Sequence, residues 1–238
     1  MTTNLNFPNF TVQGEVAIIT GGSQGIGKAC ALALANAGAK VAIVSLPSDF
    51  EKLNKTAKEI EELGGEVFPI SADITKTKDI DSIIDQVLNR FGEITILVNS
   101  AGVCFRESAV EVKEVSWDRT FDVNLRGLFF ISQKVAKKMI EQKRGKIVNI
   151  SSMNSFVGLP EHASYCASKG GVWMLTKTMA LELGKYNINV NAVAPTFTKT
   201  EMAQHVLENK KKYNAIIRNI PLNRMAEPME VAAAVLFL

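Results

Sequence analysis

A serine, a tyrosine and a lysine in the second half of the chain have the types and spacing of a proton-transfer site. Tyr165 and Lys169 stand four positions apart and lead into residues 170–183, whose apolar spacing predicts a helix. Side chains four apart share one helix face, so the phenol and the ammonium should point into the same space. We expect the cation to lower the pKa of Tyr165 toward neutral pH and so help the phenol exchange a proton with a substrate oxygen.

The third member, Ser152, ends the apolar run 146–152, which indicates a buried strand. A hydroxyl at the carboxyl end of a strand can hydrogen-bond the reacting oxygen and help place it. A tyrosine and a lysine at this spacing also occur by chance on ordinary exposed helices. The triplet therefore points to chemistry only if the rest of the chain supplies a matching frame.

The first part of the chain supplies such a frame. Residues 15–20 are apolar and rich in β-branched side chains, glycines follow at Gly21, Gly22, Gly25 and Gly27, and residues 25–37 predict a helix of small side chains. A strand, a glycine turn and a helix let backbone N–H groups face a pyrophosphate, which any Cβ would hold away. The spacing departs from the usual dinucleotide pattern, because Cys30 stands where its last glycine would be. The alternative is a tight connection without a ligand.

Strands and helices alternate along the whole chain. This pattern predicts an α/β fold, a doubly wound parallel sheet of the Rossmann type covered by helices on both faces. Ligands of such sheets bind beyond the carboxyl ends of the strands, which is where the candidate residues fall. The segments that predict strands are 15–20, 40–45, 66–70, 94–99, 146–151 and 187–193.

These motifs resemble those of the short-chain dehydrogenases/reductases, and the match runs from about residue 14 to the C-terminus. The resemblance implies an NAD(P)-dependent oxidoreductase that interconverts a secondary alcohol and a ketone by hydride transfer. It is carried by the glycine turn, by Asn99-Ser100-Ala101-Gly102 and by Asn124, Ser152, Tyr165 and Lys169.

The resemblance also implies roles. Tyr165 would be the general acid and base, Lys169 would hold the nicotinamide ribose, and Ser152 would bind the substrate oxygen. Asn124 would support Lys169 through a water molecule and complete a proton relay. Asp73 would contact the adenine and Thr200 the carboxamide. The other implied cofactor contacts, besides Tyr165 and Lys169, are Gly21, Ser23, Gln24, Gly25, Ile26, Gly27, Ser45, Ile74, Asn99, Ala101, Gly102 and Pro195.

Cofactor choice is less well marked. Ser45 ends the second predicted strand, where many family members carry an aspartate or an arginine. We find no carboxylate there to repel a 2′-phosphate, and no Arg or Lys at Ser23, Gln24, Ser45 or Leu46 to neutralise one. We therefore expect weak discrimination between NAD and NADP, with a slight preference for NADP.

The substrate side gives a weaker signal. Residues 150–156 are similar to those of polyol and sugar-acid members such as gluconate 5-dehydrogenases, and Asn154, Glu161 and His162 could hydrogen-bond a polyhydroxylated substrate. Two alternatives stay open. A sugar-nucleotide epimerase or dehydratase also uses tyrosine and lysine, but Lys28 stands where its third glycine would be. A non-catalytic dinucleotide-binding regulator would not need the intact triplet.

Composition limits the partners. The chain has 238 residues, of which 47% are hydrophobic, and its net charge of +3 is too small to indicate nucleic acid. No apolar run approaches a membrane span and no signal peptide is visible, while an odd cysteine count fits a reducing cytoplasm. His162 and His205 form no ligand-spaced cluster, so we expect no metal. The expected partner is a small-molecule substrate.

The predicted organisation is one catalytic and dinucleotide-binding domain over residues 1–238. Residues 1–13 would be an N-terminal extension and about 196–221 a partly helical substrate lid, while the last strand of the family has no counterpart. The resemblance further implies a homo-oligomer, a tetramer in many members. Residues 117–142 and the helix after Tyr165 would face the neighbouring subunits.

Overall fold

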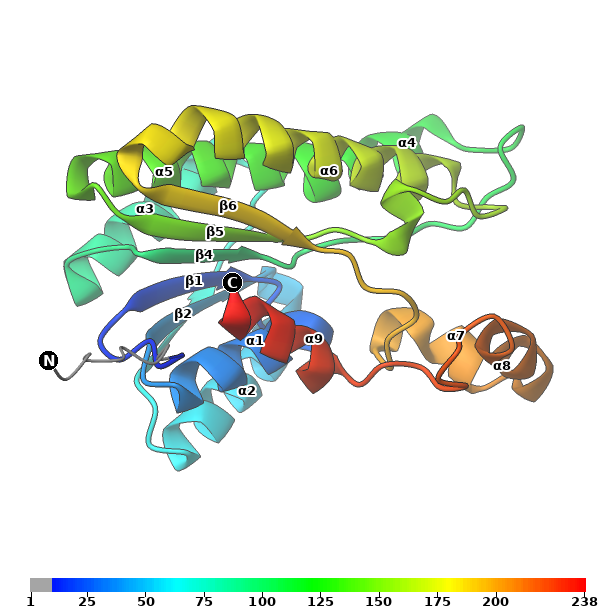
Figure 1. Ribbon diagram of the computed structural model, residues 1–238, viewed down its shortest axis with the longest axis horizontal. Helices are drawn as coiled ribbons and strands as arrows, with labels where there is room; N and C mark the ends of the chain where they lie inside the picture. The colour runs from blue at the N-terminus through cyan, green and yellow to red at the C-terminus, as the bar shows by residue number, and fades with distance from the viewer. Residues whose placement is uncertain (1–9) are drawn as a thin grey trace, which may run out of the picture.

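The centre of the molecule is a sheet of six short strands rich in β-branched side chains. The computed structural model describes residues 10–238, and all neighbouring strands run parallel in the order β3-β2-β1-β4-β5-β6 (Figure 1). Each lies within two residues of a predicted segment. The strands are β1 (Val16–Thr20), β2 (Lys40–Ser45), β3 (Val67–Ser71), β4 (Ile96–Asn99), β5 (Gly145–Ile150) and β6 (Ile188–Val193).

The strand order reverses at β1, which has β2 on one side and β4 on the other. Thr20, the last residue of β1, pairs with Val44 of β2 and with Asn99 of β4, so the three carboxyl ends meet at one edge. Open α/β sheets bind their ligands at this point. The predicted doubly wound parallel sheet of the Rossmann type is confirmed.

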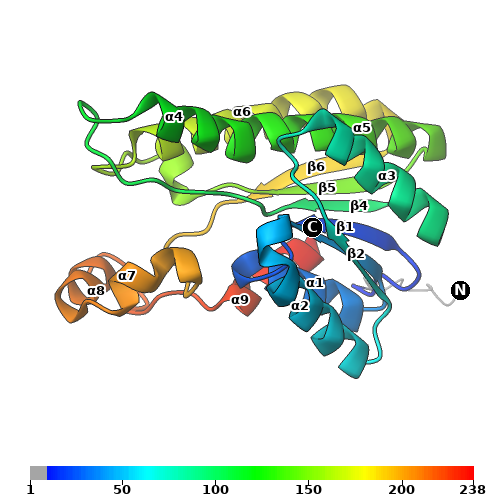
Figure 2. The same cartoon turned by 180° about the vertical axis from the view of Figure 1, so that it is seen from behind.

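Helices cover both faces of the sheet because successive strand residues point to opposite sides. In β1, Val16 and Ile18 belong to one hydrophobic core, and Ala17 and Ile19 belong to the other. The first core packs under α3, α5 and α6 and the second under α1, α2 and α9 (Figures 1 and 2). The bounds are α1 (Gly25–Asn36), α2 (Phe50–Glu62), α3 (Thr77–Phe91), α5 (Leu128–Gln142), α6 (Ala163–Leu183) and α9 (Pro228–Phe237).

The chain between β4 and β5 forms a helical segment with one irregular part. α4 (Glu114–Phe121) leads into a π-helical turn over Asp122–Gly127, and α5 follows directly. Turns of this kind are rare and occur often at functional sites. This one carries Asn124, whose side chain is fully buried.

The helix that carries Tyr165 and Lys169 begins earlier than its apolar spacing predicts. α6 starts at Ala163, so both residues lie in its first two turns. Gly171 lets this helix approach the π-helical turn closely, because a Cβ there would lie 2.9 Å from Leu125 Cδ2. The tyrosine and lysine are therefore mounted on a tightly packed element.

An arm of short helices follows β6 and projects past the carboxyl end of the sheet (Figure 1). We call residues 196–225 the lid, which contains the segment 196–221 predicted for it. Its own core is small and consists of Ala203, Val206 and Met225. Within residues 10–238 no helix combines the length and the apolarity that a membrane crossing requires. The helices of the lid are η5 (Glu201–Ala203), α7 (Gln204–Leu207) and α8 (Lys210–Ile217).

Candidate active site

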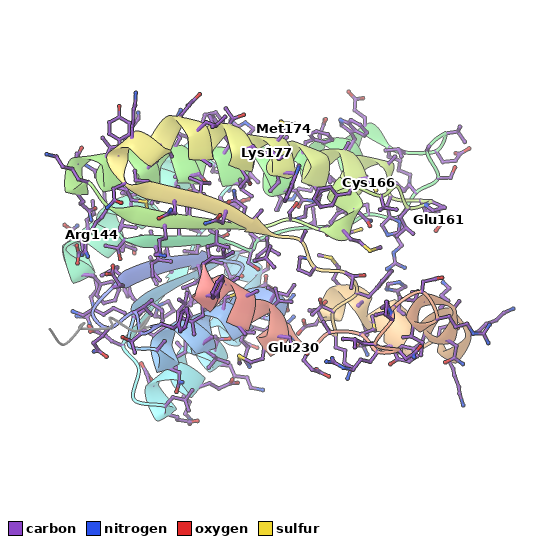
Figure 3. The ribbon with its side chains drawn as sticks, viewed as in Figure 1. Arg144, Glu161, Cys166, Met174, Lys177 and Glu230 are labelled. Carbon is purple, nitrogen blue, oxygen red and sulfur yellow. The ribbon has the colours of Figure 1, made fainter. Side chains whose placement is uncertain are left out.

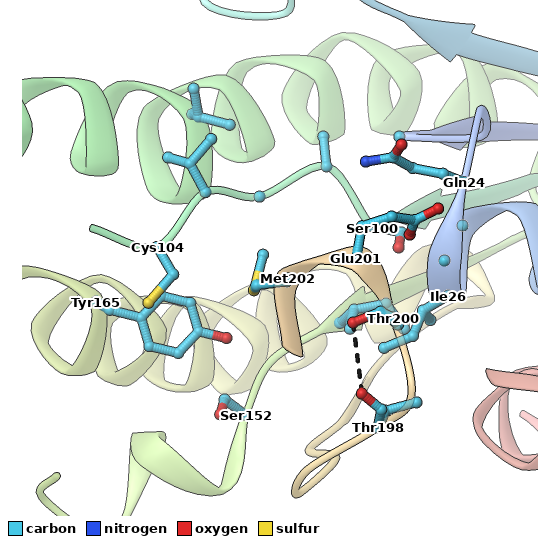
Figure 4. Close-up of a pocket in the computed structure, with 18 of the residues that line it drawn as sticks. Gln24, Ile26, Ser100, Cys104, Ser152, Tyr165, Thr198, Thr200, Glu201 and Met202 are labelled. Carbon is cyan, nitrogen blue, oxygen red and sulfur yellow. Dashed lines mark hydrogen bonds between the residues drawn. The ribbon is translucent and has the colours of Figure 1, made fainter. Parts of the chain in front are cut away.

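A cavity of about 400 Å³ opens between the carboxyl ends of the strands and the lid. Figure 4 shows side chains from the glycine turn, the loop after β4, α6 and the lid arranged around one space. Its volume falls in the range of small-molecule sites, roughly 300–1,000 Å³. Most of the predicted site residues line it, and the exceptions are Asn99, Asn124 and Glu161.

The glycine turn between β1 and α1 has the geometry of a phosphate cradle. Gly21 and Gly25 have φ angles of 69° and 56°, a region that favours glycine. A Cβ on Gly27 would lie 2.1 Å from the Gly21 carbonyl oxygen, so the helix sits too close to the turn for a side chain. Gln24 stands at the N-cap of α1 without a side-chain capping bond. The first N–H groups of α1 are therefore left for an anion, which fits a dinucleotide pyrophosphate.

The lid reaches across the cavity to this turn. A Cβ on Gly25 would lie 3.3 Å from Thr200 Cγ2 and 3.7 Å from Glu201 Oε2. The Thr200 hydroxyl donates to the Thr198 carbonyl oxygen at 3.4 Å (Figure 4), and Pro195 lines the same wall. The contact of Thr200 with the carboxamide stays a prediction.

Ser45, at the end of β2, faces the glycine turn. Its Oγ lies 2.9 Å from Ser23 Oγ and 3.5 Å from Asp49 Oδ2. Asp49 belongs to the 3₁₀ turn η1 (Pro47–Asp49) and lines the cavity. The sequence interpretation considered only the residues at the strand end and left this carboxylate out. The turn after β2 folds back toward the strand end, so the carboxylate of Asp49 lies beside the Ser45 hydroxyl.

The loop after β3 forms the wall where the adenine is predicted. Asp73 Oδ1 accepts hydrogen bonds from the Thr75 backbone N–H at 3.0 Å and the Thr75 hydroxyl at 2.8 Å, and Asp73 Oδ2 lies 3.7 Å from Arg119 Nη1. Burial alone would raise the pKa of Asp73, but the Thr75 bonds and the Arg119 charge together hold that pKa below its usual value. Ile74 lines the cavity beside this fixed carboxylate.

Tyr165, Ser152 and Lys169 meet at the opposite end of the cavity. All three line it, and Figure 4 shows the Tyr165 hydroxyl directed into the space on the side of Ser152. The Ser152 Oγ accepts from the Asn154 backbone N–H at 3.1 Å. The Lys169 ammonium donates to the Ile150 carbonyl oxygen at 2.7 Å and lies 5.8 Å from the centre of the Tyr165 ring. The strand end and the helix thus bring the predicted triplet together.

The expectation that the pKa of Tyr165 falls toward neutral pH is wrong, because burial has the largest influence on this pKa and raises it. Burial raises the pKa of Tyr165 to about 12, and the hydrogen bond with Ser152 lowers it only in part. Burial also lowers the pKa of Lys169 to about 8. Burial disfavours the charged form of each group, which is the phenolate of Tyr165 and the ammonium of Lys169, and the ammonium donates to the Ile150 carbonyl oxygen. Tyr165 therefore holds its proton at neutral pH.

Asn124 fixes the loop after β4 to α6. Its Oδ1 accepts from the Val103 N–H at 2.8 Å, and its Nδ2 donates to the Val103 carbonyl at 2.9 Å and to Ser168 Oγ at 3.1 Å. A Cβ on Gly102 would lie 3.4 Å from Asn124 Oδ1 and 3.7 Å from Lys169 Nζ, so both groups face this glycine. The water-mediated support of Lys169 stays a prediction.

The Asn99 side chain turns away from the cavity into the sheet. Its Nδ2 donates to Ser132 Oγ and to Asn149 Oδ1, both at 2.8 Å, and Asn149 Nδ2 donates to Thr176 Oγ1 at 2.9 Å. This buried network joins β4 and β5 to α5 and α6. Ala101 and Gly102, two and three residues later, are the parts of the motif that line the cavity.

The predicted substrate residues separate into two groups. Asn154 is 7% exposed and His162 is half-buried, and both line the cavity. Glu161 is exposed, has a φ of 63° and lies off the wall. The position of Glu161 therefore gives no support for a contact with the substrate, whereas the positions of Asn154 and His162 do.

Arg106 and His205, which the sequence interpretation did not assign to the site, lie at the mouth of the cavity. Arg106 Nη2 donates to His205 Nδ1 at 2.5 Å and so joins the loop after β4 to the lid. Burial first, and then the charges of Arg106 and Lys212, lower the pKa of His205, so the ring is neutral and accepts this bond. None of the ion pairs found within residues 10–238 includes Arg106. The one available sequence signal was a cation placed four residues after Gly102.

Similarity to known proteins covers nearly the whole chain. The short chain dehydrogenase family matches residues 15–211. A 3-oxoacyl-[acyl-carrier-protein] reductase of Thermotoga maritima is 42% identical, over 95% of this chain and 91% of the relative. A 2-dehydro-3-deoxy-D-gluconate 5-dehydrogenase of Escherichia coli is 38% identical, over 96% and 89%. The solved structure of a gluconate 5-dehydrogenase from Burkholderia cenocepacia, in complex with NADP and tartrate, superposes with a TM-score of 0.91 at 33% identity, over 96% and 89%.

Proposed function

The chain belongs to the short-chain dehydrogenase family, and on that premise we propose that it interconverts a keto group and a secondary alcohol on a sugar acid. Membership makes it an NAD(P)-dependent oxidoreductase. The epimerase and the non-catalytic regulator are not favoured, because the two relatives, matched over 91% and 89% of their own length, are named as a reductase and a dehydrogenase.

We assign the proton transfer to Tyr165. The phenol keeps its proton at neutral pH and its hydroxyl is directed into the cavity, so it is placed to donate that proton to a ketone oxygen. The Ser152 hydroxyl is placed to hold the same oxygen, and Lys169 supplies a positive charge close to the ring. When bound, the nicotinamide cofactor supplies or accepts the hydride.

The cofactor would be held by the glycine turn, by Ser45 and Asp73 on the adenosine side and by Thr200 on the lid. This assignment rests on the cradle at Gly27 and on the strand ends that converge there. The slight preference for NADP expected from the sequence loses its main support, because Asp49 is the carboxylate that the expectation assumed to be absent.

The observation that carries the substrate class is the charge of Arg106. Its hydrogen-bond partner is a neutral ring, so the guanidinium keeps its full charge and further N–H donors at the mouth of the cavity. A carboxylate is the group that such a fork binds best. Asn154 and His162 add hydrogen-bonding groups to the same cavity wall, as a hydroxylated chain would require.

A 3-oxoacyl thioester is the competing substrate class. Met153, Leu159 and Met202 give part of the cavity an apolar wall, and the Thermotoga maritima relative carries that activity in its name. An acyl chain gains from these side chains but makes no use of the Arg106 charge. The two classes therefore differ in what Arg106 contributes.

Steady-state assays that follow nicotinamide absorbance would separate them. The panel contains 2- and 5-ketogluconate, a neutral ketose, acetoacetyl thioester and an apolar ketone, each with NADH and NADPH. We expect the highest kcat/KM for a ketogluconate. In Arg106→Gln the KM for the ketogluconate should rise about 10- to 100-fold, because a charge-assisted hydrogen bond is lost. The change in kcat should be smaller.

Arg218→Gln is the matched control, since it removes the same charge from an exposed position on the lid. It should leave KM unchanged. A preference for the thioester or the apolar ketone, or an equal loss in both variants, would refute the sugar-acid assignment while leaving the reaction class intact.

We also propose one domain for the whole chain, a homotetramer and a cytoplasmic location. The three cysteines of the chain are all unpaired, which suits a reducing compartment. On the outer layer of α4, α5 and α6, Phe121, Phe129 and Met174 line an apolar groove, and Met174 is directed outward (Figure 3). Light scattering of wild-type protein and Met174→Glu tests the tetramer, which the variant should weaken.

A further inference from the structure

A carboxylate stands where the cofactor's adenosine ribose is proposed to lie. Asp49 lines the cavity and is half-buried, although it follows the last residue of β2 by four positions. The turn η1 explains this placement. Pro47 opens it with a fixed φ, and the Asp49 N–H donates to the Leu46 carbonyl at 2.9 Å, which closes the chain back toward the strand end.

Ser45 ties this carboxylate to the phosphate cradle. Its Oγ lies 3.5 Å from Asp49 Oδ2 and 2.9 Å from Ser23 Oγ, and Ser23 belongs to the glycine turn. The Ser23 carbonyl in turn accepts a bond from Thr56 Oγ1 at 3.1 Å, which anchors the turn to α2. Strand end, turn and helix thus hold the carboxylate at one place on the wall.

The positive charge of Lys52 opposes the effect of the Asp49 carboxylate at the ribose. Lys52 Nζ donates to Gln24 Oε1 at 2.7 Å, which brings an ammonium to the outer edge of the same turn. Lys52 is exposed and lies off the cavity wall, whereas Asp49 is half-buried and lies on it. Water and salt screen an exposed charge far more than a half-buried one. The carboxylate should therefore dominate the field at the ribose.

We infer that Asp49 sets the cofactor preference of this protein and that it favours NAD over NADP. The carboxylate accepts hydrogen bonds from the free ribose hydroxyls and repels a 2′-phosphate. The exposed ammonium of Lys52, which lies off the cavity wall, weakens this preference. The inference rests on the proposed function, because it needs the cavity to hold the adenosine half of the cofactor.

Binding, rather than turnover, tests the inference. Isothermal titration gives Kd for NAD⁺ and NADP⁺ with the wild type, Asp49→Asn and Glu51→Gln. Glu51 is an exposed acid two positions away, so it controls for net charge. We expect the wild type to bind NAD⁺ more tightly. Asp49→Asn should improve the ratio of NADP⁺ to NAD⁺ affinity about tenfold or more, and Glu51→Gln should change it less than about twofold.

Two further variants keep the test decisive. Asp49→Ser, which leaves a small polar side chain, should shift the ratio in the same direction if Asp49→Asn does not fold. Lys52→Ala should weaken NADP⁺ binding only slightly. A wild type that prefers NADP⁺, or a ratio that moves with Lys52 and not with Asp49, overturns the inference alone. Failure of the wild type to bind either nucleotide would overturn the proposed function as well.

Discussion

The catalytic end of the cavity and the lid that faces it are built in opposite ways. At the catalytic end, Asn124 is fully buried and Lys169 is 5% exposed, and both are hydrogen-bonded to backbone carbonyls. In the lid, short helices surround a core of only Ala203, Val206 and Met225. The first region rests on α6, whose Met179 and Leu183 belong to one of the two large cores of the sheet, and the second adds a small core of its own.

We propose that the two regions have separate roles in the reaction. Proton transfer needs groups held in fixed positions, which a packed helix and a strand end provide. Enclosing a substrate needs a segment that can open, and such segments come from the less stable parts of a protein. Arg106 joins the two regions, because it extends from the loop after β4 to His205 on the lid. We therefore expect changes at the catalytic end to act on kcat and changes in the lid to act on KM.

The largest effect should follow Lys169→Met, which removes the buried cation of the fixed region. We expect kcat/KM to fall by about 10³-fold or more, since the change affects both the tyrosine and the cofactor. Lys177→Met, an exposed lysine on the same helix, is the control. Steady-state kinetics with nucleotide titration measure both quantities, and a loss below tenfold would contradict a catalytic role.

Lys169→Met should also have a higher free energy of unfolding than the wild type. Burial lowers the pKa of Lys169 to about 8 from 10.5, so between these values the unfolded chain holds a proton that the folded chain does not. The free energy of unfolding that depends on this group therefore rises with pH across that window, by roughly 1.4 kcal/mol for each pH increment of about one. Denaturant titrations at about pH 7.5 and about pH 9.5 should show this rise in the wild type and its absence in Lys169→Met.

Asn124→Ala should give the next largest effect, because it loosens the fixed region without touching the reacting groups. The loss of its bonds to Val103 and Ser168 should cost about 1–3 kcal/mol of unfolding free energy. We expect kcat to fall more than KM rises. Asn214→Ala, on the exposed face of the lid, is the comparison. A destabilised variant with unchanged kcat would show that Asn124 is structural only.

Val206→Ala should give the smallest effect and act on the other region. Val206 is 2% exposed in the lid core, so its truncation should loosen the lid and raise KM about threefold, with kcat and the main unfolding transition nearly unchanged. Val110→Ala, at a 90% exposed position, should do nothing. A drop in kcat equal to the rise in KM would mean that the two regions are not separate.

Features that depend on neighbouring residues could be predicted from the sequence, whereas features that depend on contacts between distant segments could not. The strands, the glycine turn and the convergence of Ser152 with Tyr165 follow from local pattern and from the rule that parallel strands end at one edge. Asp49 was missed because the direction of a short turn decides where its side chain lies. His205 and Arg106 were missed because their contact joins segments 99 positions apart.

The Tyr165 pKa shows a different limit. Helical spacing correctly places Lys169 on the same side as the tyrosine, but spacing says nothing of how deeply the phenol is buried. Burial is the larger influence, and it raises the pKa to about 12. A charge partner can be read from four-residue spacing, whereas desolvation depends on the whole fold.

Proton transfer by Tyr165 from a fixed position is tested most directly by Tyr165→Phe. The variant keeps the ring and removes only the transferable proton. With a ketogluconate as substrate we predict a fall in kcat of about 10²- to 10⁴-fold, the usual contribution of general acid–base catalysis, with Kd for the nucleotide unchanged within about twofold. Retention of wild-type kcat with intact nucleotide binding would contradict this mechanism.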